Sequence, residues 1–344
     1  MYKITASEER NEKATEFETK SMLFMMNYYS NSSKVHWFVI DFFNDVTAIN
    51  KLQDECYDIQ SKGVKKISPC QLGRYLVTLF KNFISDFNFA DFILFIESVS
   101  PELKKELGNK SSFKIFELSS KNVLSIKSGL KDEALKKTYI EDKTKITEEN
   151  IELFLSKVTV EIDFHKKAEY IKDAVEMSSS VIVEDSYLNK IFKEIRDKQS
   201  SKKNNNCEGD LVSSIGCFYK YDKHIRKDEI EDLIINRICF KSALANLKSV
   251  PIEFAKIIKG VDETIYEEII EENQNDVFRL LNDKNNKKAF WDLFSEVVRI
   301  IKSNPNRNIE ELYELVDKEK ILKVNHLNGM SCKYFIALIE EGLK

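Results

Sequence analysis

The chain contains little glycine and proline, 9 and 4 residues respectively in a total of 344. Because both residues favour turns, their scarcity argues against a loop-rich fold. The six cysteines include no Cys-x-x-Cys pair, which favours reduced thiols in a cytoplasmic protein over a disulfide framework. They are Cys56, Cys70, Cys207, Cys217, Cys239 and Cys332.

Long apolar runs are also missing from the sequence. None reaches the roughly 18 residues that a membrane-spanning helix needs. The N-terminal residues lack the apolar core of a signal peptide. We therefore expect a protein that makes no contact with a membrane.

Several motifs of common enzyme classes are absent. The chain has no Gly-x-x-x-x-Gly-Lys-Ser/Thr or Gly-x-Gly-x-x-Gly loop and no Gly-x-Ser-x-Gly sequence, which excludes those routes to nucleotide binding and hydrolysis. The four histidines lie far apart in the sequence, without a pair at metal-ligand spacing. They are His36, His165, His224 and His326.

A net positive charge is missing too, since the formal charge is −4. Any nucleic-acid site must therefore be a local patch. Between Gln60 and Ser85 the chain has five basic residues and no acidic one. These residues are Lys62, Lys65, Lys66, Arg74 and Lys81. They predict either a surface that holds a DNA backbone or an ordinary solvated helix face.

The length allows two domains, and residues 1–145 are predicted to form the first. In order, the expected elements are a helix at 7–30, strands at 35–49 and 56–62, a helix that Ser68 caps before Pro69, and strands at 92–96 and 112–118. The apolar run Phe92–Ile96 is typical of a buried strand. This order predicts an α/β sandwich with a mixed central sheet.

Residues 146–344 are predicted to form a mainly α-helical region. Thr147 is expected to cap its first helix, and the alternating segment 158–164 predicts one strand. The polar segment 196–210, with Lys202 and Lys203 in it, predicts an exposed loop. The predicted fold class is therefore α+β, with an α/β domain followed by a mostly helical region.

A candidate metal site lies in the first part. Gln60 and Lys62 are two residues apart on one predicted strand, so their side chains point to the same face. The Asp45 carboxylate, the Gln60 amide oxygen and the Ser61 backbone carbonyl are the oxygen ligands that Mg²⁺ or Mn²⁺ would take. Lys62 would place a positive charge where negative charge accumulates during phosphodiester hydrolysis.

Other acidic residues compete for a place in this site. Asp58 shares a face with Gln60 and is a possible third ligand, while Asp41 has the same strand parity as Asp45. Glu16 and Glu18 on the first helix could approach the metal. The simpler explanation for both acidic residues is that they lie on a solvated face of that helix. The short Asp-x(14)-Gln-x-Lys pattern also occurs by chance in many chains.

These residues resemble the PD-(D/E)xK effector endonucleases of bacterial anti-phage systems, in the Mrr-like branch where Gln replaces the usual acid. The segments that carry the resemblance are Phe43–Val46, Tyr57–Gly63, Ser68–Pro69, Gly73, Leu76, Thr78–Asn82 and Phe92–Phe95. The resemblance implies a restriction-endonuclease-like domain, a Mg²⁺ or Mn²⁺ cofactor and double-stranded DNA as substrate. Lys65, Lys66, Arg74 and Lys81 would contact the DNA.

Two groups within this family differ in the second part of the chain. Nucleases of CBASS immunity carry a SAVED sensor for cyclic oligonucleotides, which has several strands. The nuclease subunit of Lamassu systems is held instead by an SMC-type ATPase subunit and often a small third subunit. The helical pattern of residues 146–344 favours the Lamassu type, in which release and self-association into a homo-oligomer would activate cleavage. A non-catalytic interaction subunit with a nuclease-like fold remains the alternative.

Overall fold

The structure is a computed structural model that describes residues 2–4, 12–177, 183–204, 207–240, 250–283 and 285–343. The chain divides into two compact units. The first comprises Met1–Tyr170 and Phe192–Asp228, and the second comprises Ile171–Ile191 and Glu229–Lys344. Residues 7–11 of the predicted first helix and the side chain of Cys239 lie outside the described residues.

The first unit contains a seven-stranded mixed sheet with the order β6-β7-β5-β4-β3-β2-β9. Strands β4, β5 and β7 run parallel, and the remaining pairs are antiparallel. The strands are β2 (Val35–Ile40), β3 (Val46–Asn50), β4 (Cys56–Lys62), β5 (Phe89–Ile96), β6 (Ser112–Lys114), β7 (Val158–Ile162) and β9 (His224–Arg226). The short strands β1 (Tyr2–Lys3) and β8 (Leu211–Val212) form a separate pair. The predicted mixed sheet is confirmed.

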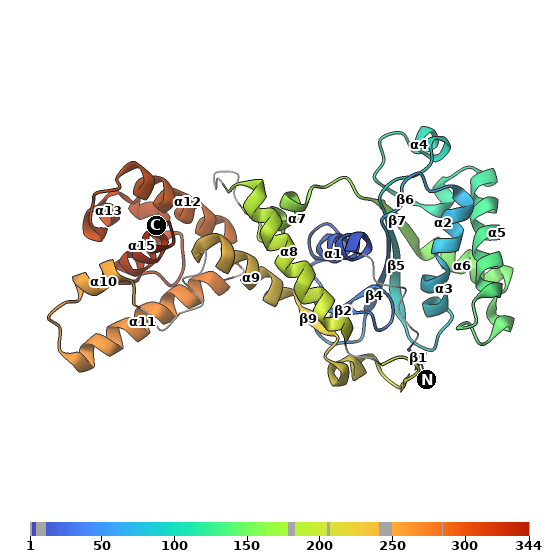
Figure 1. Cartoon of the computed structure of the whole chain (residues 1–344), viewed down its shortest axis with the longest axis horizontal. Coiled ribbons are helices and arrows are strands. Elements are labelled where there is room, and N and C mark those ends of the chain that lie inside the picture. The colour runs from blue at the N-terminus through green and yellow to red at the C-terminus, as the bar shows by residue number, and fades with distance from the viewer. Residues whose placement is uncertain are drawn as a thin grey trace. The chain divides into compact units, whose positions relative to one another are not determined.

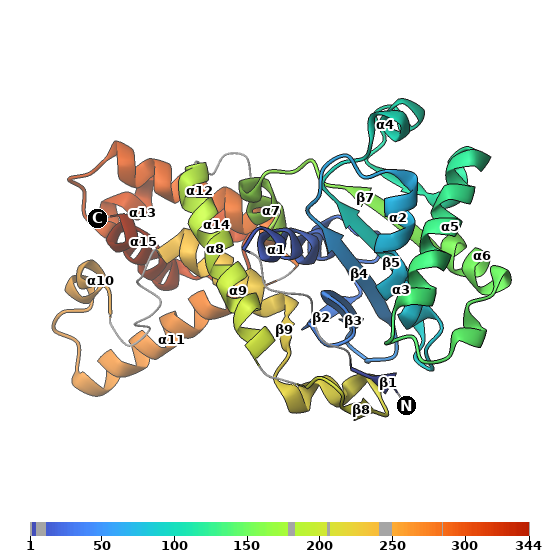
Figure 2. The ribbon, with the colours of Figure 1, turned by 45° about the vertical axis from the view of Figure 1, so that its right-hand side comes forward.

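Helices cover both faces of this sheet (Figure 1). Helix α1 (Glu12–Asn27) lies on one face, and α2 (Pro69–Tyr75), α3 (Val77–Phe83), α5 (Ser120–Lys136) and α6 (Glu148–Lys157) lie on the other, as Figure 2 also shows. Alternate side chains of β5 pack on both layers, because Phe95 contacts Phe24 of α1 and Phe92 contacts Phe154 of α6. This packing explains why the strand is apolar throughout.

Two glycines let α2 and α5 approach closely. A Cβ atom on Gly73 would lie 2.1 Å from the Ile126 carbonyl oxygen, and one on Gly129 would lie 2.2 Å from that of Cys70. Neither position has room for a side chain, so the two helix backbones are in direct contact. Ser68 caps α2 in a full capping box with Gln71, which confirms the predicted start of this helix.

The prediction of one strand over 35–49 was wrong. The chain turns at residues 41–45, and β2 and β3 pair as an antiparallel hairpin with Ile40 opposite Val46. Asp41 starts this turn with a left-handed backbone, φ 52°, which aspartate tolerates better than bulky residues. As a result, Asp45 directly precedes β3. The predicted strand at 112–118 was also too long, since residues Ile115–Glu117 form a 3₁₀ helix, η1.

The first unit continues beyond residue 145, where the sequence analysis ended the first domain. Strand β7 lies between β5 and β6 in the sheet, and β9 forms its other edge. The polar segment at 196–210 is not simply an exposed loop. Helix α8 (Asp185–Ser201) continues to Ser201, η3 (Lys202–Asn204) follows it, and Gln199 is buried. Residues 205 and 206 of that segment lie outside the described residues.

All regular elements of the second unit are helices in the residues that the structure describes, which confirms the predicted helical C-terminal region. Its helices are α9 (Lys227–Phe240), α10 (Ile252–Ile257), α11 (Glu263–Asn282), α12 (Lys287–Ser303), α13 (Ile309–Leu315), α14 (Lys318–Leu322) and α15 (Gly329–Leu343). Trp291 of α12 is fully buried and donates a hydrogen bond of 2.7 Å to the Val175 carbonyl oxygen. Helices α7 (Lys167–Ala174), α8 and α9 each contribute residues to both units.

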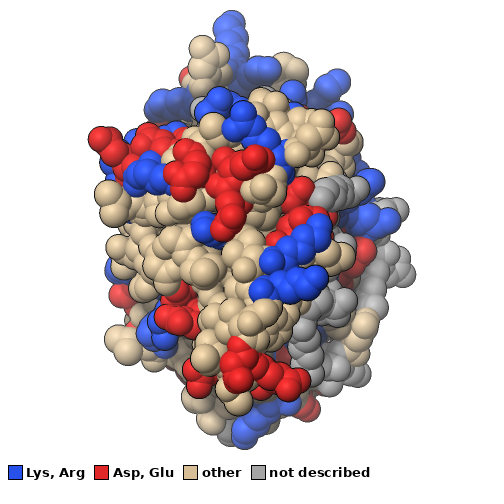
Figure 3. All heavy atoms as spheres, turned by 90° about the vertical axis from the view of Figure 1, so that its left-hand side faces the viewer, with Lys and Arg blue, Asp and Glu red and all other residues tan. Residues whose placement is uncertain are grey.

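Figure 3 looks onto the helices of the second unit. Acidic side chains gather there in separate groups around a broad uncharged area. Basic side chains are interspersed with them and form no continuous surface among the described residues of this face. The face is therefore not of the kind that attracts a nucleic-acid backbone over a large area.

Candidate functional site

The structure brings Asp45, Gln60 and Ser61 together. Asp45 Oδ2 accepts hydrogen bonds from Gln60 Nε2 at 2.6 Å, from Ser61 Oγ at 3.1 Å and from the Ser61 backbone nitrogen at 3.1 Å. The pairing of β3 with β4 accounts for this contact, because Val46 lies opposite Ile59 and the residue before Val46 therefore reaches Gln60 and Ser61. The three predicted metal ligands form one cluster at the end of β4.

Glu18 of α1 belongs to the same group of charges. Burial of its side chain and the nearby Asp45 carboxylate raise the pKa of Glu18 to about 7, while an ion pair with Lys203 acts in the opposite direction. Two carboxylates that disfavour each other's ionisation mark a site where a cation would be stabilised. Glu16, two residues earlier on α1, faces elsewhere and pairs with Lys167 at 2.7 Å.

Asp41 lies at the edge of this cluster and is held by a buried lysine. Lys223 Nζ donates to the Asp41 carbonyl oxygen at 3.0 Å and lies 3.4 Å from its Oδ2. The Asp41 carboxylate also contributes to the raised pKa of Glu18. Asp41 therefore adds negative charge near the cluster, and its side chain, like that of Glu18, pairs with a lysine.

Asp58 is fully buried beneath the cluster. Its Oδ1 accepts a hydrogen bond from Thr47 Oγ1 at 2.9 Å, and its Oδ2 accepts from Asn82 Nδ2 at 2.6 Å and from Asn44 Nδ2 at 3.5 Å. Burial raises the pKa of Asp58 to about 7, and Asp45 adds to the shift. Because both oxygens have protein donors, Asp58 is better placed to hold the 41–45 turn than to bind a metal.

Lys62 is the last residue of β4 and is partly exposed. Its Nζ lies 5.8 Å from the centre of the Tyr75 ring, a distance at which an ammonium group and an aromatic face attract each other. The alternation of β4 keeps Lys62 on the same side as Gln60. Lys62 therefore lies on the face of the sheet that α2 covers, whereas Glu18 comes from α1 on the opposite face, and Asp45 lies between them at the strand end.

The predicted DNA-contacting residues divide into two groups. Lys65, Lys66 and Arg74 are exposed on the segment that follows β4. Lys81, in contrast, is buried, and its Nζ donates to Tyr2 Oη at 2.9 Å and to the Lys3 carbonyl oxygen at 3.3 Å. Burial lowers the pKa of Lys81 to about 8. The structure therefore contradicts a DNA contact for Lys81, which instead anchors the N-terminal strand.

Sequence reasoning missed the two lysines that pair with the cluster. Lys203 was expected in a solvated loop, but its side chain is 9% exposed and pairs with Glu18. Lys223 is 2% exposed and comes from the segment before β9. Both follow the cluster by more than a hundred residues in the sequence, so no local pattern indicates them.

The donor atoms near Asp45 fit a hard divalent cation. Carboxylates of Asp45 and Glu18, the Ser61 carbonyl oxygen and a Gln60 amide turned to present its oxygen are ligands that Mg²⁺ and Mn²⁺ accept. Across the described residues, no three His, Cys, Asp or Glu side chains are grouped closely enough to hold a metal ion. A metal here would therefore depend on the amide and carbonyl oxygens as well as on the two carboxylates.

No family model, curated protein or solved structure matches this chain. The geometry of the site is therefore the basis for any functional conclusion. Of the helices that the structure describes, none has the length and apolar character needed to cross a membrane.

Proposed function

We propose that the chain is a metal-dependent endonuclease that hydrolyses phosphodiester bonds in double-stranded DNA. The observation that carries this proposal is the contact of Asp45 with Gln60 and Ser61 at the end of β4, with Glu18 close enough to share its charge. The first unit would then be a restriction-endonuclease-like domain of the PD-(D/E)xK type. Its mixed sheet with helices on both faces is consistent with that assignment.

Each residue of the site has a role that follows from its chemistry. Asp45 and Glu18 would hold Mg²⁺ or Mn²⁺, with the Gln60 amide and Ser61 carbonyl oxygens completing the protein ligands. The bound cation would polarise the phosphate and acidify a water molecule. Gln60 and the Ser61 backbone orient the Asp45 carboxylate. Lys62 places a positive charge beside the phosphate, where it can also orient the attacking water.

Exposed basic residues next to the site would position the DNA. Lys65 and Lys66 lie between β4 and α2, Arg74 lies on α2, and all three are exposed. Contacts from such side chains to phosphates give affinity with little dependence on sequence. The Lys65 Nζ lies 3.6 Å from Glu97, an exposed pair that a phosphate could displace at small energetic cost.

The helical second unit supports a role as a subunit of a larger complex. Its described residues contain no strand, in contrast to the several strands expected of a cyclic-nucleotide sensor of the SAVED type. We infer a Lamassu-like effector of bacterial anti-phage defence, restrained by an SMC-type ATPase subunit and a small third subunit. Homo-oligomerisation after release would bring two sites together for cleavage of both strands.

Expression in cells with the partner genes tests this function. Asp45→Ala, Gln60→Ala and Lys62→Ala should each abolish phage defence or toxicity, and Lys62→Ala should do so while the protein accumulates to wild-type levels. Lys51→Ala, which removes an exposed lysine from the turn between β3 and β4, should leave defence intact. Full defence by all three site variants would instead support a non-catalytic interaction subunit.

A further inference from the structure

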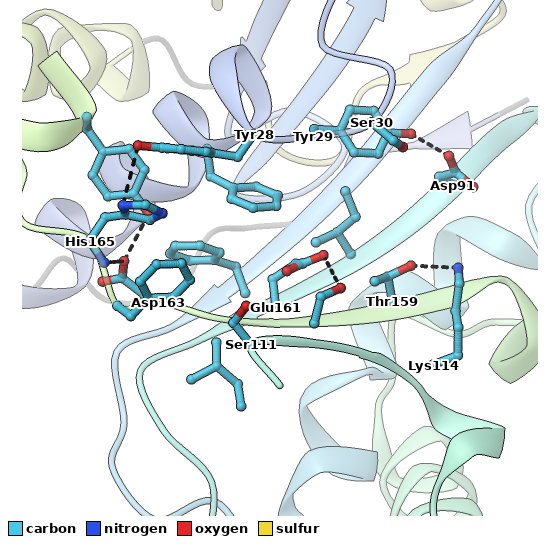
Figure 4. Close-up of a pocket in the computed structure, with 17 residues that line it drawn as sticks. Tyr28, Tyr29, Ser30, Asp91, Ser111, Lys114, Thr159, Glu161, Asp163 and His165 are labelled. Carbon is cyan, nitrogen blue, oxygen red and sulfur yellow. Dashed lines mark hydrogen bonds between the residues drawn. The ribbon is translucent and has the colours of Figure 1, made fainter. Parts of the chain in front are cut away.

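A cavity of about 520 Å³ lies on the face of the sheet that carries α1 (Figure 4). Its floor is formed by β5, β7 and β6, and its walls come from the C-terminal half of α1 and the segment that leads into α7. All of these elements belong to the first unit. The residues proposed for nuclease activity do not line this cavity, so it calls for a separate explanation.

Aromatic rings form one side of the cavity. The rings of Tyr28 and His165 are stacked with their centres 4.2 Å apart and an angle of 20° between their planes. Tyr170 meets the Tyr28 ring edge-on at 5.6 Å, and Phe24 packs against Phe95 at 5.4 Å. Figure 4 shows Tyr28 and His165 facing each other at one end of the cavity. Such a wall suits the hydrocarbon or planar part of a small ligand.

Three carboxylates line the same cavity. Asp163 is compensated by Lys20 at 2.7 Å, and it also accepts a hydrogen bond from Tyr170 Oη at 2.9 Å. Asp91 accepts hydrogen bonds from Tyr29 Oη and from Asn31 Nδ2. Glu161 on β7 accepts one hydrogen bond of 2.7 Å from Ser112 Oγ through its Oε1. Figure 4 places Glu161 between the ring pair at one end and Asp91 at the other.

The balance of charge in the lining is negative. Besides the three carboxylates, the only Lys or Arg among the described lining residues is Lys114, whose Nζ donates to Thr159 Oγ1 at 2.6 Å. Partial burial raises the pKa of Glu161, although the hydrogen bond from Ser112 and the charge of Lys114 act in the opposite direction. A phosphate or carboxylate ligand would meet repulsion here, whereas a cation would relieve it.

We propose that this cavity binds a small organic cation, with a guanidinium or ammonium group on Glu161 and its carbon skeleton on the aromatic wall. A guanidinium ion can donate two parallel hydrogen bonds to one carboxylate. The faces of Tyr28 and Tyr170 attract positive charge and cover the apolar part of such a ligand. The proposal depends only on the cavity and is independent of the nuclease assignment.

Calorimetric titration of the full chain with butylguanidinium tests this proposal, and butylurea serves as the uncharged analogue of nearly the same shape. Wild type should bind butylguanidinium at least about tenfold more tightly than butylurea, because only the cation gains the charge-assisted contact. Glu161→Gln should weaken butylguanidinium binding about tenfold, a change of about 1.4 kcal/mol. Glu149→Gln, on the exposed face of α6, removes the same charge and should leave binding unchanged.

A second variant examines the aromatic wall separately. Tyr28→Leu keeps an apolar side chain but removes the ring, so butylguanidinium should bind several-fold more weakly while the carboxylates remain. Circular dichroism and thermal unfolding of each variant verify that the fold is intact. Equal affinity for butylurea and butylguanidinium, no heat of binding with butylguanidinium up to millimolar concentration, or unchanged affinity in folded Glu161→Gln would each overturn the proposal.

Discussion

Gln60 Nε2 donates a hydrogen bond of 2.6 Å to Oδ2 of Asp45, across the pairing of β3 with β4. The contact joins a turn residue to a strand residue, with the Gln60 side chain buried and Asp45 partly exposed. The same carboxylate oxygen also accepts from the Ser61 backbone nitrogen. Asp45 therefore has a structural function in addition to the proposed metal ligation, and its substitutions should affect both.

Removing the Asp45 carboxylate should destabilise the fold. In Asp45→Ala the buried Gln60 amide and the Ser61 nitrogen lose their acceptor, which costs about 1–3 kcal/mol of the free energy of unfolding. Urea unfolding measures this loss. Asp132→Ala, at an exposed position of α5, should change stability by less than about 0.5 kcal/mol. Equal stability of the two variants would show that the Asp45 contacts are not formed.

Glu18 should contribute to metal affinity, whereas Glu16 on the same helix should not. Glu18→Gln removes a carboxylate whose charge interacts with Asp45, so the affinity for Mn²⁺ should fall about tenfold or more. Glu16→Gln makes the same change in charge at a residue that pairs with Lys167. Calorimetric titration with Mn²⁺ compares the two variants, and an equal loss in both would argue against a specific role for Glu18.

Asp58 should make stability depend on pH in an unusual direction. Its pKa is about 7 in the folded chain, against an ordinary value of 3.8. Between these values the unfolded chain releases a proton that the folded chain keeps, so this residue's contribution to stability falls as pH rises and is constant above about 7. Urea unfolding from pH 4 to 8 should show the stability of wild type falling relative to Asp58→Asn. A free energy of unfolding of wild type that rises relative to that of Asp58→Asn as pH increases would contradict the assignment.

Lys65 and Lys81 should behave in opposite ways, although both belong to the basic segment after Gln60. Lys65→Ala should weaken DNA binding and reduce its dependence on salt, because an exposed lysine can contact phosphate. Lys81→Met should leave that dependence unchanged and lower the free energy of unfolding by about 1–3 kcal/mol, since Tyr2 and the Lys3 carbonyl lose a buried partner. Fluorescence anisotropy over a salt series, together with urea unfolding, separates the two effects.

The contact between α2 and α5 predicts a severe effect at Gly73. In Gly73→Ala the new methyl group would lie 2.1 Å from the Ile126 carbonyl oxygen, so the helices must separate. We expect a loss of about 1–3 kcal/mol or more in the free energy of unfolding. Ser128→Ala, on the exposed side of α5, should be nearly neutral. Thermal unfolding of both variants tests whether the helices lie this close.

Local patterns in the sequence predicted part of this structure well. The apolar run around Phe92 predicted a buried strand, and Ser68 before a proline predicted a helix start, because both signals arise from neighbouring residues. The spacing of Gln60 and Lys62 also led to the strand that carries the candidate site. Each of these inferences depends on residues within one element.

The features that sequence reasoning missed depend on distant residues or on one unusual backbone conformation. Asp41 breaks the apolar run 35–49 through a left-handed φ, which its residue type permits but does not require. The burial of Lys81 depends on Tyr2 from the N-terminal strand, and the pairing of Glu18 depends on Lys203. Tertiary contacts of this kind leave no periodic trace in the sequence.

Cleavage of supercoiled plasmid by the purified protein, with Mg²⁺ or Mn²⁺, tests the central claim most directly. Wild type, alone or with the proposed SMC-type partner, should convert the plasmid to linear DNA. EDTA and Lys62→Ala should each abolish this conversion, whereas Lys51→Ala should cleave like wild type. Cleavage that persists in EDTA or in folded Lys62→Ala, or its absence from wild type even with the partner complex, would contradict a metal-dependent nuclease at this site.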